Sequence, residues 1–285
     1  MKNILRYIYL NIPFKKYFFL FLRNNFKIKQ NIYKHLWFKG FFSVSFSNKN
    51  FFIYSLPTII ENEIFWNGLG TTWEPLSLRI WSKIVKKKKI VFDIGANTGI
   101  YSLLGCAFNS GSLVYAFEPN IECVKALEKA KNKNKFKIKT INYALSNKKG
   151  FVYFDGYQIQ NKKNLKKIKT IRLDNFIEIN KIKSLDLVKL DVELHEVQVL
   201  EGMGKYLNEF KPDFLIEVLN KNMAKKLNYL FKNLGYNYIS INDKKLKLKK
   251  LSKIEKSPFY NILICKKETY AIVREKFKKY FNETK

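Results

Sequence analysis

Cysteine is scarce in this 285-residue chain. The three cysteines, Cys106, Cys123 and Cys265, are odd in number and show neither a C-x-x-C pair nor the spacing of a zinc site. We therefore expect no disulfide framework and no metal site. Cys106 and Cys123 fall on predicted helix faces and are expected to be core thiols. This cysteine usage is typical of a reducing compartment, and it predicts a cytoplasmic protein.

Long hydrophobic runs are also missing. The longest apolar run near the N-terminus, Tyr17–Leu22, is bounded by Lys15, Lys16 and Arg23, whereas a membrane-spanning helix needs roughly 20 apolar residues. A secretory signal would need a longer apolar core and small residues for cleavage. The sequence thus predicts no spanning segment and no signal peptide.

Acidic residues are few. The chain has 23 Asp and Glu against 54 Lys and Arg, for a formal charge of +31. Such a charge can attract nucleic acid or an anionic membrane surface. The basic runs Lys86–Lys89, Lys162–Lys169 and Lys244–Lys250 fall between predicted elements or in short strands. We favour a compositional bias that keeps these segments solvated over a specific anionic partner.

A dinucleotide fingerprint is absent, although a related turn is present. The fingerprint is G-x-G-x-x-G, but here the apolar run Ile90–Ile94, which contains Asp93, leads into Gly95-Ala-Asn-Thr-Gly99 and then an apolar helical segment. A strand, a glycine turn and a helix N-terminus form a cradle whose N–H groups point outward to a polar ligand. Asp93 would repel a pyrophosphate and would suit the ammonium and sulfonium groups of S-adenosylmethionine.

A second carboxylate supports this interpretation. Glu118 follows the apolar run Leu113–Phe117, and an acidic residue at the end of the second strand of an α/β fold commonly accepts hydrogen bonds from ribose hydroxyls. The simpler alternative is that the glycines only make the turn.

Another group of polar residues lies in the segment from Leu185 to Glu196. Its mostly apolar strand ends near Asp191, and Lys189, Asp191, Glu193 and His195 alternate, so an extended backbone places them on one face. We predict that these four residues form the catalytic group beside the methyl donor, because methyl transfer to a hydroxyl benefits from a positioned base.

Each member of this group also has a plainer role. Glu193 and Glu196 would be favourable in the first turn of a helix. His195 could cap or pack, and Lys189 could pair with Asp191 or Glu217. The chain lacks an Asn/Asp-Pro-Pro-Tyr/Phe motif and a Pro-Cys pair, which favours oxygen over a base nitrogen or carbon as the methyl acceptor.

Strands alternate with helical segments over most of the chain, which predicts an α/β fold with a mostly parallel, doubly wound sheet and helices on both faces. The predicted strands are Ile90–Ile94, Leu113–Phe117, Phe136–Tyr143, Leu185–Leu190, Phe214–Val218, Tyr236–Ile241 and Tyr260–Ile264. The predicted helices are Thr71–Val85, Ile100–Phe108, Ile121–Lys131, Leu194–Leu207, Met223–Asn233 and Glu268–Phe281, with an extra strand pair at Phe151–Phe154 and Ile168–Leu173.

The N-terminal part differs in texture. Basic and aromatic residues interleave from Arg6 to Phe42, and strand pieces are predicted at Phe41–Phe46 and Phe51–Tyr54. We predict that residues 1–70 form a basic, aromatic cap on the catalytic domain or a membrane-proximal region, and that residues 71–285 form that domain. An interfacial helix on anionic lipid would use the same residues.

The ordered set of motifs resembles the FkbM-type S-adenosylmethionine-dependent methyltransferases. The matching segments are Val91–Gly99, Ala116–Asn120, Asn142–Ser146, Leu173-Asp174, Lys189–Glu193 with Glu196, Leu200–Gly202 and Phe214–Glu217. Together they cover about residues 70–220.

The resemblance implies a class I methyltransferase sheet of seven strands with the last one antiparallel. It implies donor contacts from Asp93, Gly95, Asn97 and Gly99, and ribose contact from Glu118. It further implies adenine contact around Asn142 and Ala144, and places Glu74 near the amino-acid end of the donor. The family usually has glycine after the glutamate of its Asp-x-Glu motif, where this chain has Leu194, which we expect to narrow the acceptor space.

We therefore predict an S-adenosylmethionine-dependent O-methyltransferase. The expected acceptor is a hydroxylated molecule, a saccharide of a cell-surface glycan or its lipid-linked precursor, with peripheral contact at the inner face of an anionic membrane. A nucleic-acid methyltransferase recruited by positive charge and a non-catalytic donor-binding protein are the alternatives.

Overall fold

The computed structural model describes residue 9 and residues 12–155, 159–160, 165–256 and 261–281. An eight-stranded sheet forms its centre, in the order β13-β12-β14-β11-β10-β3-β4-β5. Its strands are β3 (Ile90–Ile94), β4 (Leu113–Phe117), β5 (Ile138–Ile141), β10 (Leu187–Leu190), β11 (Asp213–Glu217), β12 (Asn237–Asn242), β13 (Lys247–Leu251) and β14 (Asn261–Cys265).

The strand directions confirm the predicted class I methyltransferase sheet. β5, β4, β3, β10 and β11 run parallel, and β14 lies between β11 and β12, antiparallel to both. The prediction of seven strands was one short, because β13 forms an antiparallel hairpin with β12. β13 lies at the edge and overlaps the run Lys244–Lys250, and lysines on an edge strand discourage pairing with another chain.

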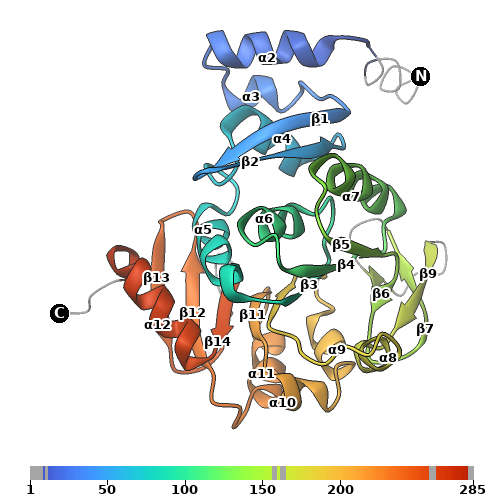
Figure 1. Cartoon of the computed structure of the whole chain (residues 1–285), viewed down its shortest axis with the longest axis vertical. Helices are drawn as coiled ribbons and strands as arrows, with labels where there is room; N and C mark the ends of the chain where they lie inside the picture. The colour runs from blue at the N-terminus through green and yellow to red at the C-terminus, as the bar shows by residue number, and fades with distance from the viewer. Residues whose placement is uncertain (1–8, 10–11, 156–158, 161–164, 257–260, 282–285) are drawn as a thin grey trace.

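Helices cover both faces of the sheet (Figure 1). They are α5 (Pro75–Ile84), α6 (Ile100–Phe108), α7 (Ile121–Asn134), α8 (Leu173–Ile179), α9 (Glu196–Glu201), α10 (Tyr206–Phe210), α11 (Lys221–Leu230) and α12 (Lys267–Lys276), with short 3-10 turns at Val85–Lys87 and Lys278–Tyr280.

The buried core forms two clusters, one on each face of the sheet, because successive strand residues point to opposite faces. Val91 packs with Leu103 and Trp81 on the α5 and α6 side, while the next residue, Phe92, packs with Leu200 on the α9 side. Both faces are thus buried, as expected for parallel strands rich in apolar residues.

Most predicted elements form, with shifted ends. The extra strand pair is confirmed and belongs to a small four-stranded sheet, in the order β6-β9-β7-β8, made of β6 (Ala144–Leu145), β7 (Gly150–Phe154), β8 (Ile159–Gln160) and β9 (Lys166–Ile171). The predicted helix Leu194–Leu207 was wrong, because it is two helices, α9 and α10. Gly204 between them has φ +53°, which interrupts the helix. Tyr260 and residues Lys162–Asn164 of the predicted elements and basic runs lie outside the described residues.

The N-terminal part forms a layer above α6 and α7 (Figure 1). It holds α2 (Lys15–Asn25), α3 (Gln30–Tyr33), the hairpin of β1 (Gly40–Phe46) with β2 (Lys49–Ser55), and α4 (Ile59–Asn67). Alternate hairpin residues such as Phe46 and Ile53 join the same buried cluster as Leu103 of α6 and Leu127 of α7. Arg6 and Tyr7 of the predicted aromatic region lie outside the described residues.

Candidate active site

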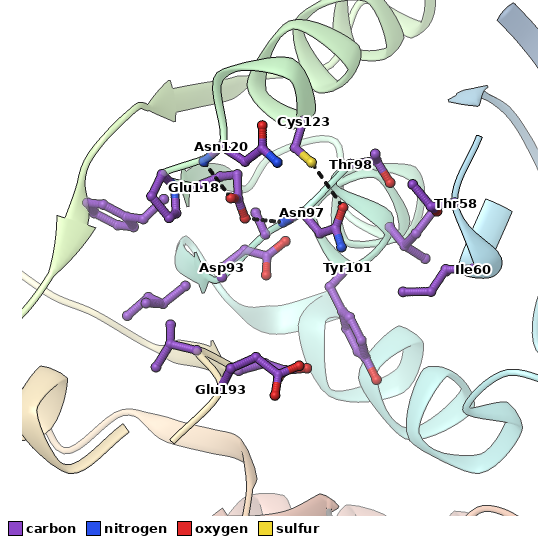
Figure 2. A pocket seen from close by; sticks show the side chains of 18 of the residues that line it. Thr58, Ile60, Asp93, Asn97, Thr98, Tyr101, Glu118, Asn120, Cys123 and Glu193 are labelled. Atoms are coloured by element: carbon purple, nitrogen blue, oxygen red, sulfur yellow. Dashed lines mark hydrogen bonds between the residues drawn. The ribbon is translucent and has the colours of Figure 1, made fainter. Parts of the chain in front are cut away.

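A cavity of about 670 Å³ lies where β3, β4 and β10 end, at the edge where open α/β sheets bind their ligands. Its volume is within the range of small-molecule sites. Asp93 and Glu118 both line it, and their carboxylates face the same space (Figure 2). The two predicted acidic groups are therefore brought together around one hollow.

The glycine turn shapes one wall of this cavity. Gly95 and Gly99 have φ of +80° and +86°, which glycine adopts at little cost. A Cβ on Gly95 would lie 1.7 Å from the main-chain oxygen of Asp191, and a Cβ on Gly99 would lie 2.3 Å from Leu127 Cδ1. Close packing against main chain thus requires glycine at position 95, whereas at Gly99 the positive φ is the main requirement, because the end of the Leu127 side chain can shift.

The N–H groups of the turn do not form the outward-pointing cradle that we expected. Gly95 and Ala96 donate to the carbonyl oxygen of Phe117 at 2.9 and 3.0 Å, and Gly99 donates to that of Ala96 at 2.7 Å. The N–H of Asn97 donates to Glu118 Oε2 at 2.8 Å. The end of β4 and Glu118 satisfy three of these donors and the turn itself satisfies that of Gly99, so these N–H groups do not form an anion cradle.

Asp93 is a buried acid at the end of β3. Ser102 Oγ, one turn into α6, donates to Asp93 Oδ2 at 2.6 Å, and Lys189 is its register partner on β10. Burial raises the pKa of Asp93 to about 6, although the Ser102 hydrogen bond and the Lys189 charge oppose that rise. A cation in the cavity would favour the ionised form.

Glu118 is held from both sides. Its Oε2 accepts from Asn97 N–H, and its Oε1 accepts from Asn120 N–H at 2.7 Å. Burial raises its pKa to about 7. Each carboxylate oxygen has a second lone pair, and the group lines the cavity, so it can still accept from ligand hydroxyls.

The predicted adenine-contact segment is only partly at the cavity. Ala144 lines it, together with Tyr143. Asn142 is not among the lining residues, because its side-chain amide donates to the carbonyl oxygens of Glu118 and Pro119 at 2.9 and 3.0 Å. Asn142 therefore braces the turn that carries Glu118.

Across the cavity lies an acidic group around one buried lysine. Lys189, 1% exposed, reaches Asp191 Oδ2 at 2.8 Å. The carboxylates of Asp191, Glu193 and Glu217 lie within 4.8 Å of one another. Burial and the neighbouring Asp191 charge raise the pKa of Glu217 above its ordinary value, which favours its protonated form. Although burial opposes the charged form of Lys189, the acids around it raise its pKa above its ordinary value.

We expected Lys189, Asp191, Glu193 and His195 to share one face, and this prediction was wrong for His195. β10 ends at Leu190, and Glu193 and Leu194 have φ of +53° and +75°, so the alternation stops there. His195 instead lies 3.0 Å from Ser146 Oγ through Nε2 and does not line the cavity. Lys189, Asp191 and Glu193 do line it.

Leu194, which we expected to narrow the acceptor space, does not line the cavity. Its side chain is 49% exposed and is absent from the cavity wall, because the left-handed turn directs it to the surface. Glu196 stabilises this turn, since its Oε1 accepts from Val192 N–H at 3.0 Å.

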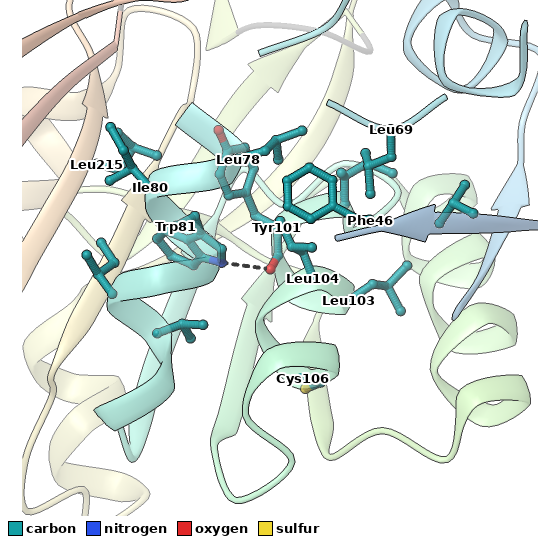
Figure 3. Packing of buried hydrophobic residues seen from close by; sticks show 14 of the residues in the cluster. Phe46, Leu69, Leu78, Ile80, Trp81, Tyr101, Leu103, Leu104, Cys106 and Leu215 are labelled. Atoms are coloured by element: carbon teal, nitrogen blue, oxygen red, sulfur yellow. Dashed lines mark hydrogen bonds between the residues drawn. The ribbon is translucent and has the colours of Figure 1, made fainter. Parts of the chain in front are cut away.

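Glu74 acts one layer behind the cavity. It precedes α5 with φ +44° and accepts from the hydroxyl of Tyr101, which does line the cavity. Trp81 of α5 donates through Nε1 to the carbonyl oxygen of Tyr101 at 3.1 Å (Figure 3). Burial raises the pKa of Glu74 to about 7. Glu74, which we expected near the amino-acid end of the donor, therefore does not line the cavity itself but contacts a residue that does.

Sequence reasoning missed the contribution of the N-terminal layer. Trp37 and residues 56–60 line the cavity, and Glu61 of α4 accepts from the hydroxyl of Thr98 in the glycine turn. No local motif marks these residues. The aromatic content around Trp37 is the one signal that could have indicated them.

The strand order and the acidic cavity define a class I methyltransferase. The family model of the methyltransferase FkbM domain matches residues 93–238, which are 146 of the 285 residues. The chain belongs to the FkbM methyltransferase family.

Several solved structures are similar at low identity. A methyltransferase FkbM from Methylobacillus flagellatus KT is 18% identical, with a TM-score of 0.46, and the match covers 63% of this chain but only 44% of that one. A putative caffeoyl-CoA O-methyltransferase from Staphylococcus aureus is 13% identical, with coverages of 73% and 91% and a TM-score of 0.44. TYW2 from M. jannaschii, in complex with AdoMet, is 14% identical, with coverages of 79% and 84% and a TM-score of 0.42. The curated proteins include no match.

Proposed function

We propose that this protein is an S-adenosylmethionine-dependent O-methyltransferase whose acceptor is a hydroxyl of a saccharide or a lipid-linked saccharide. One observation carries the choice of donor. The charged residues that line the cavity are four acids, Asp93, Glu118, Asp191 and Glu193, and one lysine that is paired with Asp191. A strongly basic protein thus has an acidic cavity, which suits a cationic ligand and disfavours a pyrophosphate.

The residues present fit this donor. When bound, S-adenosylmethionine supplies a methyl group activated by its sulfonium charge. Glu118 would hold the ribose hydroxyls, Asp93 and the glycine turn would lie along the amino-acid portion, and Ala144 with Tyr143 would border the adenine. Several N–H groups of the turn are already hydrogen-bonded within the protein, and Gly95 closely approaches Asp191, so the carboxylates would supply the polar contacts on this side.

Asp191 and Glu193 would have different roles toward the acceptor hydroxyl. Asp191 contacts the ammonium of Lys189 and lies beside the carboxyl of Glu217, a fixed position that suits it to orient a hydroxyl. Glu193 forms no ion pair with the part of the chain that the structure describes, although the Lys189 charge acts on it, and it lines the cavity from an exposed position. We assign to Glu193 the acceptance of the hydroxyl proton as the new O–C bond forms.

The deciding experiment compares ligands by titration calorimetry. We expect S-adenosylmethionine and S-adenosylhomocysteine to bind and NAD not to bind, and binding of NAD alone would contradict the proposal. With labelled donor and a cell-envelope extract, Glu193→Gln should keep donor affinity and lower turnover roughly 10²–10⁴-fold. Equal loss of both properties would disprove the assigned role of Glu193.

The net charge of +31 keeps a nucleic-acid acceptor as the second candidate. It predicts binding to RNA or DNA that weakens steeply with salt. Methyl transfer to the envelope extract, without salt-dependent nucleic-acid binding, would eliminate it.

A further inference from the structure

Exposed apolar side chains are concentrated at one end of the molecule. Seven of the fourteen large apolar side chains that are exposed in the described part of the chain lie between residues 12 and 32. Phe14, Tyr17, Phe18 and Phe21, at the start of α2 and along it, are 78%, 63%, 57% and 55% exposed. Their spacing of three and four residues makes one stripe along the helix.

The opposite side of α2 is fixed to the rest of the protein. Phe19, 4% exposed, packs on Trp66 of α4 with ring centroids 5.9 Å apart. Arg23 donates to the carbonyl oxygen of Phe65 at 2.9 Å, and Lys16 donates to that of Phe41. The stripe therefore faces away from the rest of the protein. α2 itself lies at the far edge of the N-terminal layer (Figure 1).

The charge around this stripe is of one sign. Residues 1–60 contain ten Lys and Arg and no Asp or Glu, and Lys27, Lys29 and Lys34 are exposed beside α2. Two copies of such a surface would repel each other, which disfavours a homodimer through it. Duplex nucleic acid would match the charge but would place phosphates against the phenyl rings. A single strand, whose bases can stack on such rings, would show itself in the test below by displacing the protein from the vesicles, which would contradict the proposal.

We propose that the outward face of α2 binds the surface of an anionic lipid bilayer, with its aromatic rings in the headgroup layer and the lysines on lipid phosphates. The combination of an apolar stripe and flanking cations is the signature of a helix that lies in the membrane interface. No helix in the described parts of the chain is long and apolar enough to cross a membrane. The same N-terminal layer supplies Trp37 and residues 56–60 to the cavity wall, so one layer carries both the proposed membrane face and part of the cavity.

The test is co-sedimentation of the full chain with vesicles of phosphatidylcholine, alone or mixed with phosphatidylglycerol. We expect binding to the mixed vesicles only, weakened by salt. Phe18→Ser with Phe21→Ser should reduce the partition coefficient roughly tenfold or more. The matched control, Ile179→Ser with Tyr229→Ser, removes two side chains that are 79% and 80% exposed elsewhere and should leave it unchanged.

Four outcomes would overturn the proposal. They are no binding to the mixed vesicles, equal loss in both double variants, a dimer seen by light scattering that only Phe18→Ser with Phe21→Ser abolishes, or displacement of the protein from the vesicles by a single-stranded nucleic acid. Affinity for S-adenosylmethionine, measured on the same variants, should stay constant, so failure here is distinguishable from failure of the proposed activity.

Discussion

At the residue scale, two buried carboxylates line the cavity. Asp93 and Glu118 are 1% and 7% exposed, and an ionised carboxylate is costly to bury without a partner. Their raised pKa values express this cost. A cationic ligand would offset it, so these two residues should be the strongest determinants of donor affinity.

Asp93→Asn and Glu118→Gln should each weaken S-adenosylmethionine binding by roughly 10- to 100-fold, because each removes a charge-assisted contact. Titration calorimetry measures the change. Glu122→Gln is the control, since Glu122 lies close in sequence but is exposed in the first turn of α7. Unchanged affinity in both site variants would mean that the donor does not occupy this cavity.

Gly95 is required because the main chain of Asp191 leaves no room for a Cβ, in addition to its positive φ. Gly95→Ala and Gly235→Ala both place alanine at positive φ, +80° and +77°, but nothing lies within 4 Å of a Cβ at Gly235. We expect Gly95→Ala to lower the free energy of unfolding by about 2 kcal/mol more than Gly235→Ala, because Asp191 and β10 must move. Urea denaturation measures both variants, and equal losses would show that the close approach does not matter.

At the scale of elements, the turn from β10 to α9 decides which of its side chains reach the cavity. Two successive residues, Glu193 and Leu194, have left-handed backbone conformations, which cost non-glycine residues roughly 1–2 kcal/mol each. The turn keeps Glu193 at the cavity and moves Leu194 and His195 away from it. Family members with glycine at the position of Leu194 would meet the same backbone requirement without strain.

Leu194→Gly should therefore be more stable than Leu194→Ala by about 1 kcal/mol, since both remove the side chain and only alanine retains the strain. Thermal and urea unfolding of the pair measure this difference. Donor affinity should be the same in both variants, because Leu194 does not line the cavity. A more stable alanine variant would contradict the left-handed conformation at this residue.

At the scale of the whole molecule, several buried acids link stability to pH. Burial raises the pKa of Glu61, Glu74, Glu118 and Glu196 to about 7, from 4.5. The folded protein therefore binds more protons than the unfolded chain between about pH 4.5 and 7. The free energy of unfolding that these groups contribute is present below that interval and is lost as the pH rises through it.

Without ligand, these four acids should make the free energy of unfolding smaller at pH 8 than at pH 5.5. Glu61→Gln changes a side chain that is 1% exposed. Between about pH 4.5 and 7 it should reduce the slope of the free energy of unfolding against pH by about 1.4 kcal/mol per pH unit. Circular dichroism melts across this range measure both proteins. S-Adenosylmethionine should raise the melting temperature more at pH 8, where Asp93 and Glu118 are ionised, and a steeper profile in the variant would contradict this account.

The sequence by itself determined the strand, turn and helix around Gly95, the order of the alternating elements, and the positions of Asp93, Glu118 and Asp191. It could do so because apolar periodicity and glycine turns are local properties, and the ends of parallel strands necessarily meet at one edge. It could not foresee that Asn142 and Glu74 act behind the cavity.

Only the tertiary structure decided that His195 turns to Ser146, that Glu217 joins Asp191, and that Trp37 and residues 56–60 wall the cavity. These relations depend on the backbone direction after a strand ends and on packing between segments far apart in the chain. Neither leaves a periodic trace in the sequence, because the side chains that meet are selected by the space between layers and not by their spacing along the chain.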